Sequence, residues 1–359
     1  MMNHFAKRLL DWHAQHGRHD LPWQHPRTAY RVWVSEIMLQ QTQVGTVIGF
    51  FDRFMQRFPD LASLAHADVD EVMALWQGLG YYARARNLHQ AARQIMARHA
   101  GEFPRQVEQV RALPGIGPST AGAILAQAFG QRHAILDGNV KRVLARHAGI
   151  EGPPEKAAVS RKLWEFAWRH TPETNLPAYT QAIMDLGATI CRRSRPDCAR
   201  CPVAADCVAR RENRCDELPT RASRRAVPVR QTRMLLIRGP EGLLMVRRPP
   251  AGIWGGLWSL PEWPDAGLPD ALDRLIQSAG QAPTPFGDFS HRFTHFQLEA
   301  RVFATGVEEP PPGVGDQRDW QWVQSDTEEA LGMPTPIRRF LEQSRVISGP
   351  VQDKSTRTD

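Results

Sequence analysis

Two carboxylates stand in surroundings that suit acid–base chemistry. Glu36 lies in the apolar helical run 32–42. Partial loss of water there would raise the pKa of its carboxyl group and keep a proton on it near neutral pH. Asp137 stands just before the helical pattern 138–142, where its simplest role is an N-cap. Taken as a pair, one carboxyl group could protonate a leaving group while the other, ionised, stabilises developing positive charge.

Four cysteines form a C-x6-C-x2-C-x5-C array at Cys191, Cys198, Cys201 and Cys207. Thiolates this close in sequence usually share a metal centre. Zinc is one alternative, but its usual pattern is two close pairs, and the unequal spacings within one loop favour a [4Fe–4S] cluster. Cys215 lies outside the spacing and is predicted to be a free thiol. The loop would present arginines to phosphate groups, or these merely offset cluster charge in solvent: Arg192, Arg193, Arg195 and Arg200.

The segment 113–122, Leu-Pro-Gly-Ile-Gly-Pro-Ser-Thr-Ala-Gly, follows one helical pattern and opens another. Gly115 and Gly117 would let the backbone adopt positive φ and approach a ligand closely, and Pro118 suits a first helical turn. Free N–H groups at the start of the next helix would then form a phosphate seat. A tight turn between two helices without any ligand is the alternative.

A second glycine-containing turn, 78–87, places Tyr81 where an aromatic ring could wedge between bases. The alternative is a core tyrosine beside a solvated arginine face. Like the phosphate seat, this turn would suit contact with a nucleic-acid duplex.

The composition of the chain limits the classes of partner and the compartment that these motifs suit. The net charge is +7 and the pI is about 9.5, which favours a polyanionic partner such as nucleic acid. Residues 1–17 resemble an amphipathic helix more than a secretory signal, and no apolar run is long enough to span a bilayer. Five cysteines, an odd number gathered in one region, suit a reducing compartment. The predicted location is the cytoplasm, in association with the nucleoid.

The motifs divide between two predicted domains. Residues 1–210 show helical patterns broken by Gly and Pro, and the predicted metal loop, 191–207, closes this domain. A basic linker is predicted at 211–231. The pattern then changes to short strands, at 234–237, 243–246 and 293–304, within a small α/β domain at 232–345. A disordered tail is predicted at 346–359.

Taken together, these motifs resemble the helix-hairpin-helix DNA glycosylases, and within them the adenine glycosylases of the MutY type. The resemblance covers nearly the whole chain. It rests on the four-cysteine array and on the segments 35–42, 78–82, 113–117 and 136–141. It implies a mostly α helix-hairpin-helix domain with an iron–sulfur loop, followed by an α/β Nudix-like domain.

The resemblance also implies site roles. Glu36 would protonate N7 of a flipped adenine and then act as a base for water, while Asp137 would stabilise the oxocarbenium-like sugar or bond to it transiently. Trp23 would line the adenine pocket, and Gln41 and Tyr81 would occupy the base stack around the mispair. Further DNA contacts are expected at Gly115, Gly117, Ser119 and Lys141. The implied partner is double-stranded DNA with adenine opposite 8-oxoguanine or guanine, and the implied state is a monomer with one [4Fe–4S] cluster.

Ser119 distinguishes between two possible enzyme activities. Relatives of the endonuclease III type carry a Lys nucleophile at this position, and a hydroxyl group cannot form the Schiff base that efficient strand cleavage needs. The sequence therefore predicts a monofunctional glycosylase. Two alternatives are an endonuclease III-like glycosylase/AP lyase and a non-catalytic iron–sulfur regulator that binds DNA.

The second domain resembles the Nudix fold at 247–250 and 252–258. It is expected to lack hydrolase chemistry, because the helical segment 271–280 offers only Asp273 where paired Glu residues would be needed. Phe293, Thr294 and His295 correspond to the Phe-Ser-His turn that reads the lesion in this family, with Thr in place of Ser. These residues are expected to contact 8-oxoguanine, and an ordinary half-buried strand is the alternative.

Overall fold

The computed structural model describes residues 4–221, 227–249, 252–264, 267–293, 295–308, 319–324 and 331–347. These fold into two compact units. The first contains residues 1–67 and 84–224, and the second contains residues 68–83 and 225–359. Thr294, residues 222–226 of the predicted linker and residues 348–359 of the predicted tail lie outside the described part of the chain.

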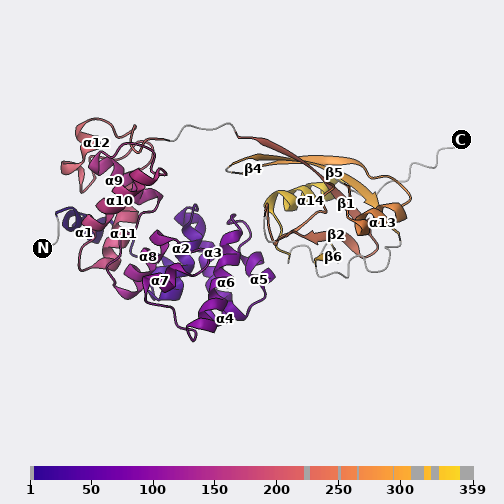
Figure 1. The fold of residues 1–359 in the computed structure, drawn as a ribbon, viewed down its shortest axis with the longest axis horizontal. Helices are drawn as coiled ribbons and strands as arrows, with labels where there is room; N and C mark the ends of the chain where they lie inside the picture. The colour runs from indigo at the N-terminus through magenta and orange to yellow at the C-terminus, as the bar shows by residue number, and fades with distance from the viewer. Residues whose placement is uncertain are drawn as a thin grey trace. The chain divides into compact units, whose positions relative to one another are not determined.

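The first unit is helical, as predicted (Figure 1). Polar caps begin several of its helices: the Thr28 hydroxyl accepts a hydrogen bond of 3.2 Å from Arg31 N at the start of α2, and Asp60 caps α4 in the same way. Its helices are α1 (His4–His16), α2 (Ala29–Leu39), α3 (Val44–Arg57), α4 (Leu61–His66), α6 (Ala83–Arg98), α7 (Val107–Arg111), α8 (Pro118–Phe129), α9 (Gly138–Ala148), α10 (Ala157–His170), α11 (Leu176–Asp185) and α12 (Val208–Arg211), with short turns η1 (Pro22–Gln24), η2 (Leu186–Ile190) and η3 (Ala204–Asp206).

Helix α8 joins the two sides of the first unit, because it packs against both α2 and α11. It is nearly all apolar and buried from Ala121 to Ala126. Gly122 is required within it, since an added Cβ would lie 2.4 Å from the carbonyl oxygen of Ala134. The chain that leads into α9 therefore passes directly across α8.

The second unit contains an α/β sheet, as predicted (Figure 1). Its described strands form a six-stranded sheet in the order β3-β2-β1-β5-β4, with β6 paired to β2. Strands β1 and β5 are parallel and the other pairs are antiparallel. The elements are α5 (Val69–Leu75), β1 (Val229–Gly239), β2 (Gly242–Arg247), β3 (Trp258–Ser259), α13 (Asp270–Ser278), β4 (Thr284–Arg292), β5 (Gln297–Gly306), β6 (Trp320–Val323) and α14 (Thr335–Ile347).

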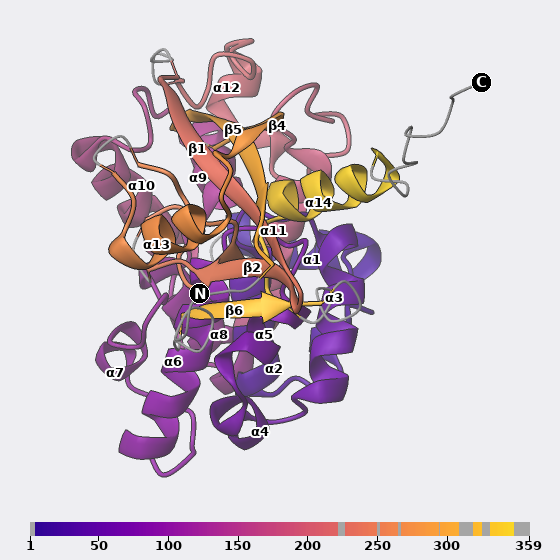
Figure 2. The same ribbon diagram turned by 90° about the vertical axis from the view of Figure 1, so that its right-hand side faces the viewer.

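Alternation along β1 divides the core of this unit between the two faces of the sheet. Met234 and Leu236 pack with residues of α14, whereas Leu235 and Ile237 pack with α13. Helices α13 and α14 therefore cover opposite faces, as Figure 2 shows.

The segment 68–83 packs with the C-terminal chain in this second unit. The Tyr82 hydroxyl donates a hydrogen bond of 3.3 Å to the carbonyl oxygen of Met333, and Arg338 Nη2 donates one of 3.1 Å to Gln77 Oε1. Arg247 forms an ion pair with Asp70. The turn at 78–82, which the sequence analysis considered with the helical part, thus shares its contacts with the α/β domain.

Three local expectations differ from the structure. The residues that follow α12 are not an unpacked linker: Leu218 is buried and its carbonyl oxygen accepts a hydrogen bond of 2.8 Å from Arg146 Nε. Strand β1 begins at Val229, earlier than the predicted 234. The predicted strand 293–304 begins only at Gln297, because Phe293 N donates to the carbonyl oxygen of Phe296 and closes a turn between β4 and β5.

Within the described residues, we find no helix with the length and apolar character that a membrane span requires.

Candidate active site and metal centre

Glu36 in α2 is held by a side chain of α8. Gln127 Nε2 donates a hydrogen bond of 2.9 Å to Glu36 Oε1, and Gln127 is only 4% exposed. Desolvation of the carboxyl group, followed by repulsion from Asp137, raises the pKa of Glu36 to about 8, although the hydrogen bond from Gln127 acts in the opposite direction. Glu36 is therefore protonated at neutral pH and able to act as a proton donor.

Asp137 stands at the start of α9, and its Oδ1 accepts a hydrogen bond of 2.7 Å from Val140 N. It is thus an N-cap, the simpler of the two roles considered for it. Burial raises the pKa of Asp137, while the backbone N–H groups of Val140 and Asn139 and the charges of Arg142 and Lys141 act to lower it. Because Asp137 also raises the pKa of Glu36, the two carboxyl groups lie within electrostatic reach of one another.

Arg84, at the start of α6, fixes the end of α2 that follows Glu36. It is 8% exposed, and its Nη1 donates hydrogen bonds of 2.9, 2.8 and 2.6 Å to the carbonyl oxygens of Ile37, Met38 and Gln40. Carbonyl groups at the end of a helix have no partner within it, so a buried cation satisfies them well. Gln41 then leaves the helix with a φ of 59° and an exposed side chain.

The predicted hairpin connects α7 and α8. Gly115 has a φ of 78°, as expected, and an added Cβ would lie 3.0 Å from Asn87 Cβ. The same expectation is wrong for Gly117, which caps α8 with a φ of −87°. An added Cβ at Gly117 would meet no atom within 4 Å and would project into open space, so the glycine leaves the backbone accessible to a ligand. Both glycines are exposed, and the Ser119 Oγ accepts a hydrogen bond of 2.9 Å from Leu136 N.

The remaining predicted DNA contacts differ in accessibility. Tyr81 is 49% exposed with a φ of 51°, and Lys141 is half-buried in the first turn of α9. Trp23 is only 3% exposed and packs edge-on against Phe51, with ring centroids 5.4 Å apart. Trp23 can therefore present only a small part of its ring to a ligand.

The four cysteines of the array line one cavity, which Cys215 also lines. All five are free thiols. Burial, and then the proximity of the thiols of Cys191, Cys207 and Cys198, raises the pKa of Cys201 to about 12. Among the described residues, no three His, Cys, Asp or Glu side chains form a group that could hold a metal ion. The thiols are nevertheless half-buried around one cavity, and a cationic metal centre held there would supply the charge that lets them deprotonate.

Two arginines of α9 hold the first cysteine of the array. Arg142 Nε donates a hydrogen bond of 2.7 Å to the carbonyl oxygen of Cys191, and Arg146 Nη1 donates one of 3.4 Å to its Sγ. Arg142 also donates to Asn139 Oδ1 at 2.8 Å. The helix that begins at Asp137 therefore also positions the cysteine loop. The loop arginines are all exposed: Arg192, Arg193, Arg195 and Arg200.

The predicted lesion-reading residues belong to the turn between β4 and β5. The Phe293 ring stacks on Phe296 with centroids 4.5 Å apart and lies 5.6 Å from the ring of Trp254. His295 is exposed, and Thr294 is outside the described residues. The alternative of a half-buried strand does not apply at Phe293 and His295, which stand in the turn.

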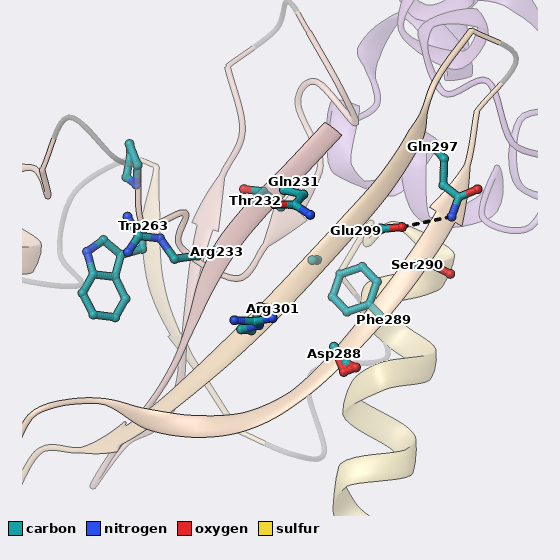
Figure 3. A pocket seen from close by; sticks show the side chains of 12 residues that line it. Gln231, Thr232, Arg233, Trp263, Asp288, Phe289, Ser290, Gln297, Glu299 and Arg301 are labelled. Carbon is teal, nitrogen blue, oxygen red and sulfur yellow. Dashed lines mark hydrogen bonds between the residues drawn. The ribbon is translucent and has the colours of Figure 1, made fainter. Parts of the chain in front are cut away.

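A polar hollow of about 670 Å³ lies on the same sheet, on the face that α13 covers farther along (Figure 3). Gln297 Nε2 donates a hydrogen bond of 3.4 Å to Glu299 Oε1 along β5, and both side chains line the hollow together with those of Arg233, Asp288 and Arg301. Phe293 and His295 are not part of this lining. The hollow and the turn are therefore separate features of the domain.

Sequence reasoning missed Gln127, Arg84 and the position of Cys215. Gln127 had a signal, because it is a lone polar residue inside the apolar run of α8. Arg84 had none, since nothing near it in sequence indicates that it reaches the end of α2. Cys215 was set aside because its spacing falls outside the array.

Comparisons with known proteins agree with the two-part fold. Residues 34–168 match the HhH-GPD superfamily of base excision DNA repair proteins, and residues 233–343 match the NUDIX domain. The adenine DNA glycosylase of Buchnera aphidicola subsp. Acyrthosiphon pisum (strain APS) is 34% identical over 340 residues, which cover 94% of this chain and 97% of that protein.

One further sequence relative and one solved structure agree with this match. The adenine DNA glycosylase of Homo sapiens is 33% identical over 408 residues, covering 96% of this chain and 74% of the human protein. The structure of a thermostable thymine-DNA glycosylase, 28% identical, superposes with a TM-score of 0.53 over 58% of this chain and 95% of its own. The sequence relationship extends over both domains, and this chain belongs to the adenine DNA glycosylase family of base-excision-repair enzymes.

Proposed function

We propose that this enzyme hydrolyses the N-glycosidic bond of adenine mispaired with 8-oxoguanine or guanine in double-stranded DNA. The observation that carries the proposal is the carboxyl group of Glu36, a half-buried residue held by the buried Gln127 at 2.9 Å and within electrostatic reach of Asp137, where desolvation raises its pKa to about 8. A protonated Glu36 would donate to N7 of a flipped adenine, and an ionised Asp137 would stabilise the positive charge on the sugar. The test is single-turnover release of free adenine from both duplexes.

We propose that the reaction stops at the abasic site. Strand cleavage through a Schiff base needs an amine, and the corresponding residue, Ser119, has a hydroxyl group that accepts a hydrogen bond from Leu136 N. Product strands should therefore break only after alkaline treatment. Cleavage without alkali would favour the endonuclease III-like alternative, and absence of adenine release would favour a regulator that only binds DNA.

The two domains would divide the task. Residues 1–210 would bind DNA and perform the chemistry, with contacts from Trp23, Gln41, Gly115, Gly117 and Lys141. Tyr81 would wedge into the base stack, and residues 232–345, joined through 211–231, would read the opposite strand. The exposure of Gln41, Gly115, Gly117 and Tyr81 supports contacts of this kind, because each can meet a duplex without local unfolding.

A [4Fe–4S] cluster is the proposed cofactor, with Cys191, Cys198, Cys201 and Cys207 as ligands. When bound, it would supply structural rigidity to the loop 191–207 rather than take part in bond cleavage. The exposed arginines of the loop would then meet phosphate groups in a fixed register. Four equivalents of iron and of acid-labile sulfide per chain would support this assignment, and zinc in their place would contradict it.

The pH dependence of adenine release tests the role of Glu36. We expect the single-turnover rate to fall above about pH 8, because the proton donor ionises there. The hydrogen bond from Gln127 favours the ionised form, so Gln127→Met should shift this alkaline limb to higher pH. The measurement is a rate profile from pH 6 to about 10 for both proteins, with pH range chosen around the raised pKa. If the alkaline limb is unchanged in the variant, ionisation of Glu36 is not its cause.

A substitution at His295 tests whether the β4–β5 turn recognises 8-oxoguanine. We expect His295→Ala to slow adenine release opposite 8-oxoguanine by roughly tenfold and release opposite guanine much less, because a base-edge contact is typically worth about 1–3 kcal/mol. His295 is exposed on the β4–β5 turn, so the substitution removes no buried packing. Gln281→Ala, an exposed polar position between α13 and β4, is the control. Equal slowing on both duplexes would make the turn a general DNA contact.

A further inference from the structure

Cys215 occupies a place that its sequence spacing does not indicate. It lines the same cavity as the four cysteines of the array, and its Sγ lies 3.9 Å from Cys198 Sγ. The residue is partly exposed and forms no disulfide. The cavity is therefore lined by five thiols, one more than a cluster of this type needs.

The turn that carries Cys215 is tied to the rest of the first unit. Arg214 donates hydrogen bonds of 2.5, 3.1 and 3.4 Å to the carboxylates of Glu151, Glu217 and Glu212. On the other side of Cys215, the carbonyl oxygen of Leu218 accepts a hydrogen bond of 2.8 Å from Arg146 Nε. Arg146 also donates to Cys191 Sγ, so the turn and the array share one anchor. Cys215 is thus held beside Cys198 from both ends of its turn.

We propose that Cys215 is a reserve ligand that can replace Cys198 at one iron of the cluster. This inference rests on the proposed [4Fe–4S] cofactor. The exchange is a ligand substitution without change of oxidation state: the bond from iron to Cys198 Sγ breaks, a bond to Cys215 Sγ forms, and the proton of the Cys215 thiol passes to the Cys198 thiolate. Four thiolates would hold the cluster before and after the exchange.

Geometry favours Cys198 as the position that is exchanged. It is the cysteine of the array for which a contact between its sulfur and Cys215 Sγ is observed. A cysteine side chain can move its sulfur between staggered χ1 positions without moving the backbone, so two sulfurs in contact can take the same place in turn. Loss of Cys198, through oxidation or substitution, would then leave a complete set of ligands.

The test is the iron and acid-labile sulfide content of four alanine variants, together with the visible absorption of the cluster. Alanine is used because a serine oxygen could itself bind iron. We expect Cys215→Ala and Cys198→Ala each to retain a nearly full complement of iron. Cys201→Ala and the double variant Cys198→Ala with Cys215→Ala should lose most of it. Far-UV circular dichroism shows whether each variant has kept its helices.

A second readout uses the unmodified chain and does not depend on the folding of any variant. During anaerobic alkylation of the iron-loaded protein, exchange should expose Cys198 as well as Cys215, so mass spectrometry should find both labelled well before Cys201. Labelling of Cys215 alone would overturn the proposal, as would a folded Cys198→Ala variant that loses iron as completely as Cys201→Ala. Zinc, or no metal, in the unmodified chain would instead contradict the cofactor.

Discussion

Replacement of Glu36 by glutamine is expected to lower the single-turnover rate of adenine release by roughly 10⁴-fold, the upper range for loss of a general acid. The amide has the shape of the carboxyl group but no proton to donate to N7. Its oxygen can still accept the hydrogen bond from Gln127 Nε2, which in the parent enzyme is 2.9 Å long. The substitution therefore removes the proton donor while preserving the packing between α2 and α8.

The measurement is adenine release from a duplex with adenine opposite 8-oxoguanine, at enzyme concentrations that saturate the DNA. Duplex affinity, measured in parallel, should stay near that of the parent, because the substitution leaves the residues proposed to contact DNA unchanged. The matched control is Glu71→Gln, the same change in helix α5. A Glu36→Gln enzyme that excised adenine at nearly the parent rate would end the proposed role of this residue.

Replacement of Asp137 by asparagine should be the second most damaging change, with a loss of about 10²–10³-fold in the rate of adenine release. Asparagine is as good an N-cap as aspartate, so its side-chain oxygen can keep the hydrogen bond from Val140 N and preserve the start of α9. It has no negative charge to offset the positive charge that develops on the sugar. Single-turnover rates on the same duplex measure this loss.

Asp137→Ala provides the comparison that separates charge from capping. It removes both, whereas Asp137→Asn removes only the charge. If the charge is what matters, the two variants should be impaired to a similar degree in adenine release, and only the alanine variant should show reduced helix content. Normal excision by Asp137→Asn together with poor excision by Asp137→Ala would return Asp137 to the role of a helix cap.

The features that could be predicted from sequence are those in which a residue and its surroundings lie within one segment. Glu36 is flanked by apolar residues at helical spacing, so partial desolvation of its carboxyl group could be anticipated, and the spacing of the four cysteines placed them in one loop. The two-domain fold followed from the change in apolar period after the helical half. In each case the signal is a pattern among residues that are neighbours along the chain.

The features that were missed depend on contacts between distant segments. Arg84 meets the end of α2 from 44 residues away, measured to Gln40, and Gln127 meets Glu36 from 91 residues away. The turn around Cys215 is ordered because Arg146 reaches Leu218, 72 residues along the chain. A local pattern of charge predicts solvation for such a turn, and only the folded chain provides the partners that order it. The mistaken positive φ at Gly117 has a smaller cause, since a helix cap there requires an extended backbone that any residue can adopt.

The raised pKa of Glu36 also has a thermodynamic cost to the fold. In the folded chain this pKa is about 8, against 4.5 for the same group in its reference state. Between these two pH values the unfolded chain gives up a proton that the folded chain retains, so the free energy of unfolding decreases as the pH rises and levels off above the folded pKa. The total decrease in the free energy of unfolding over this pH range is on the order of a few kcal/mol, a large part of the stability of a typical domain. The close packing of α2 against α8 and the capture of its last carbonyl groups by Arg84 must therefore offset the cost of keeping an acid where water is scarce.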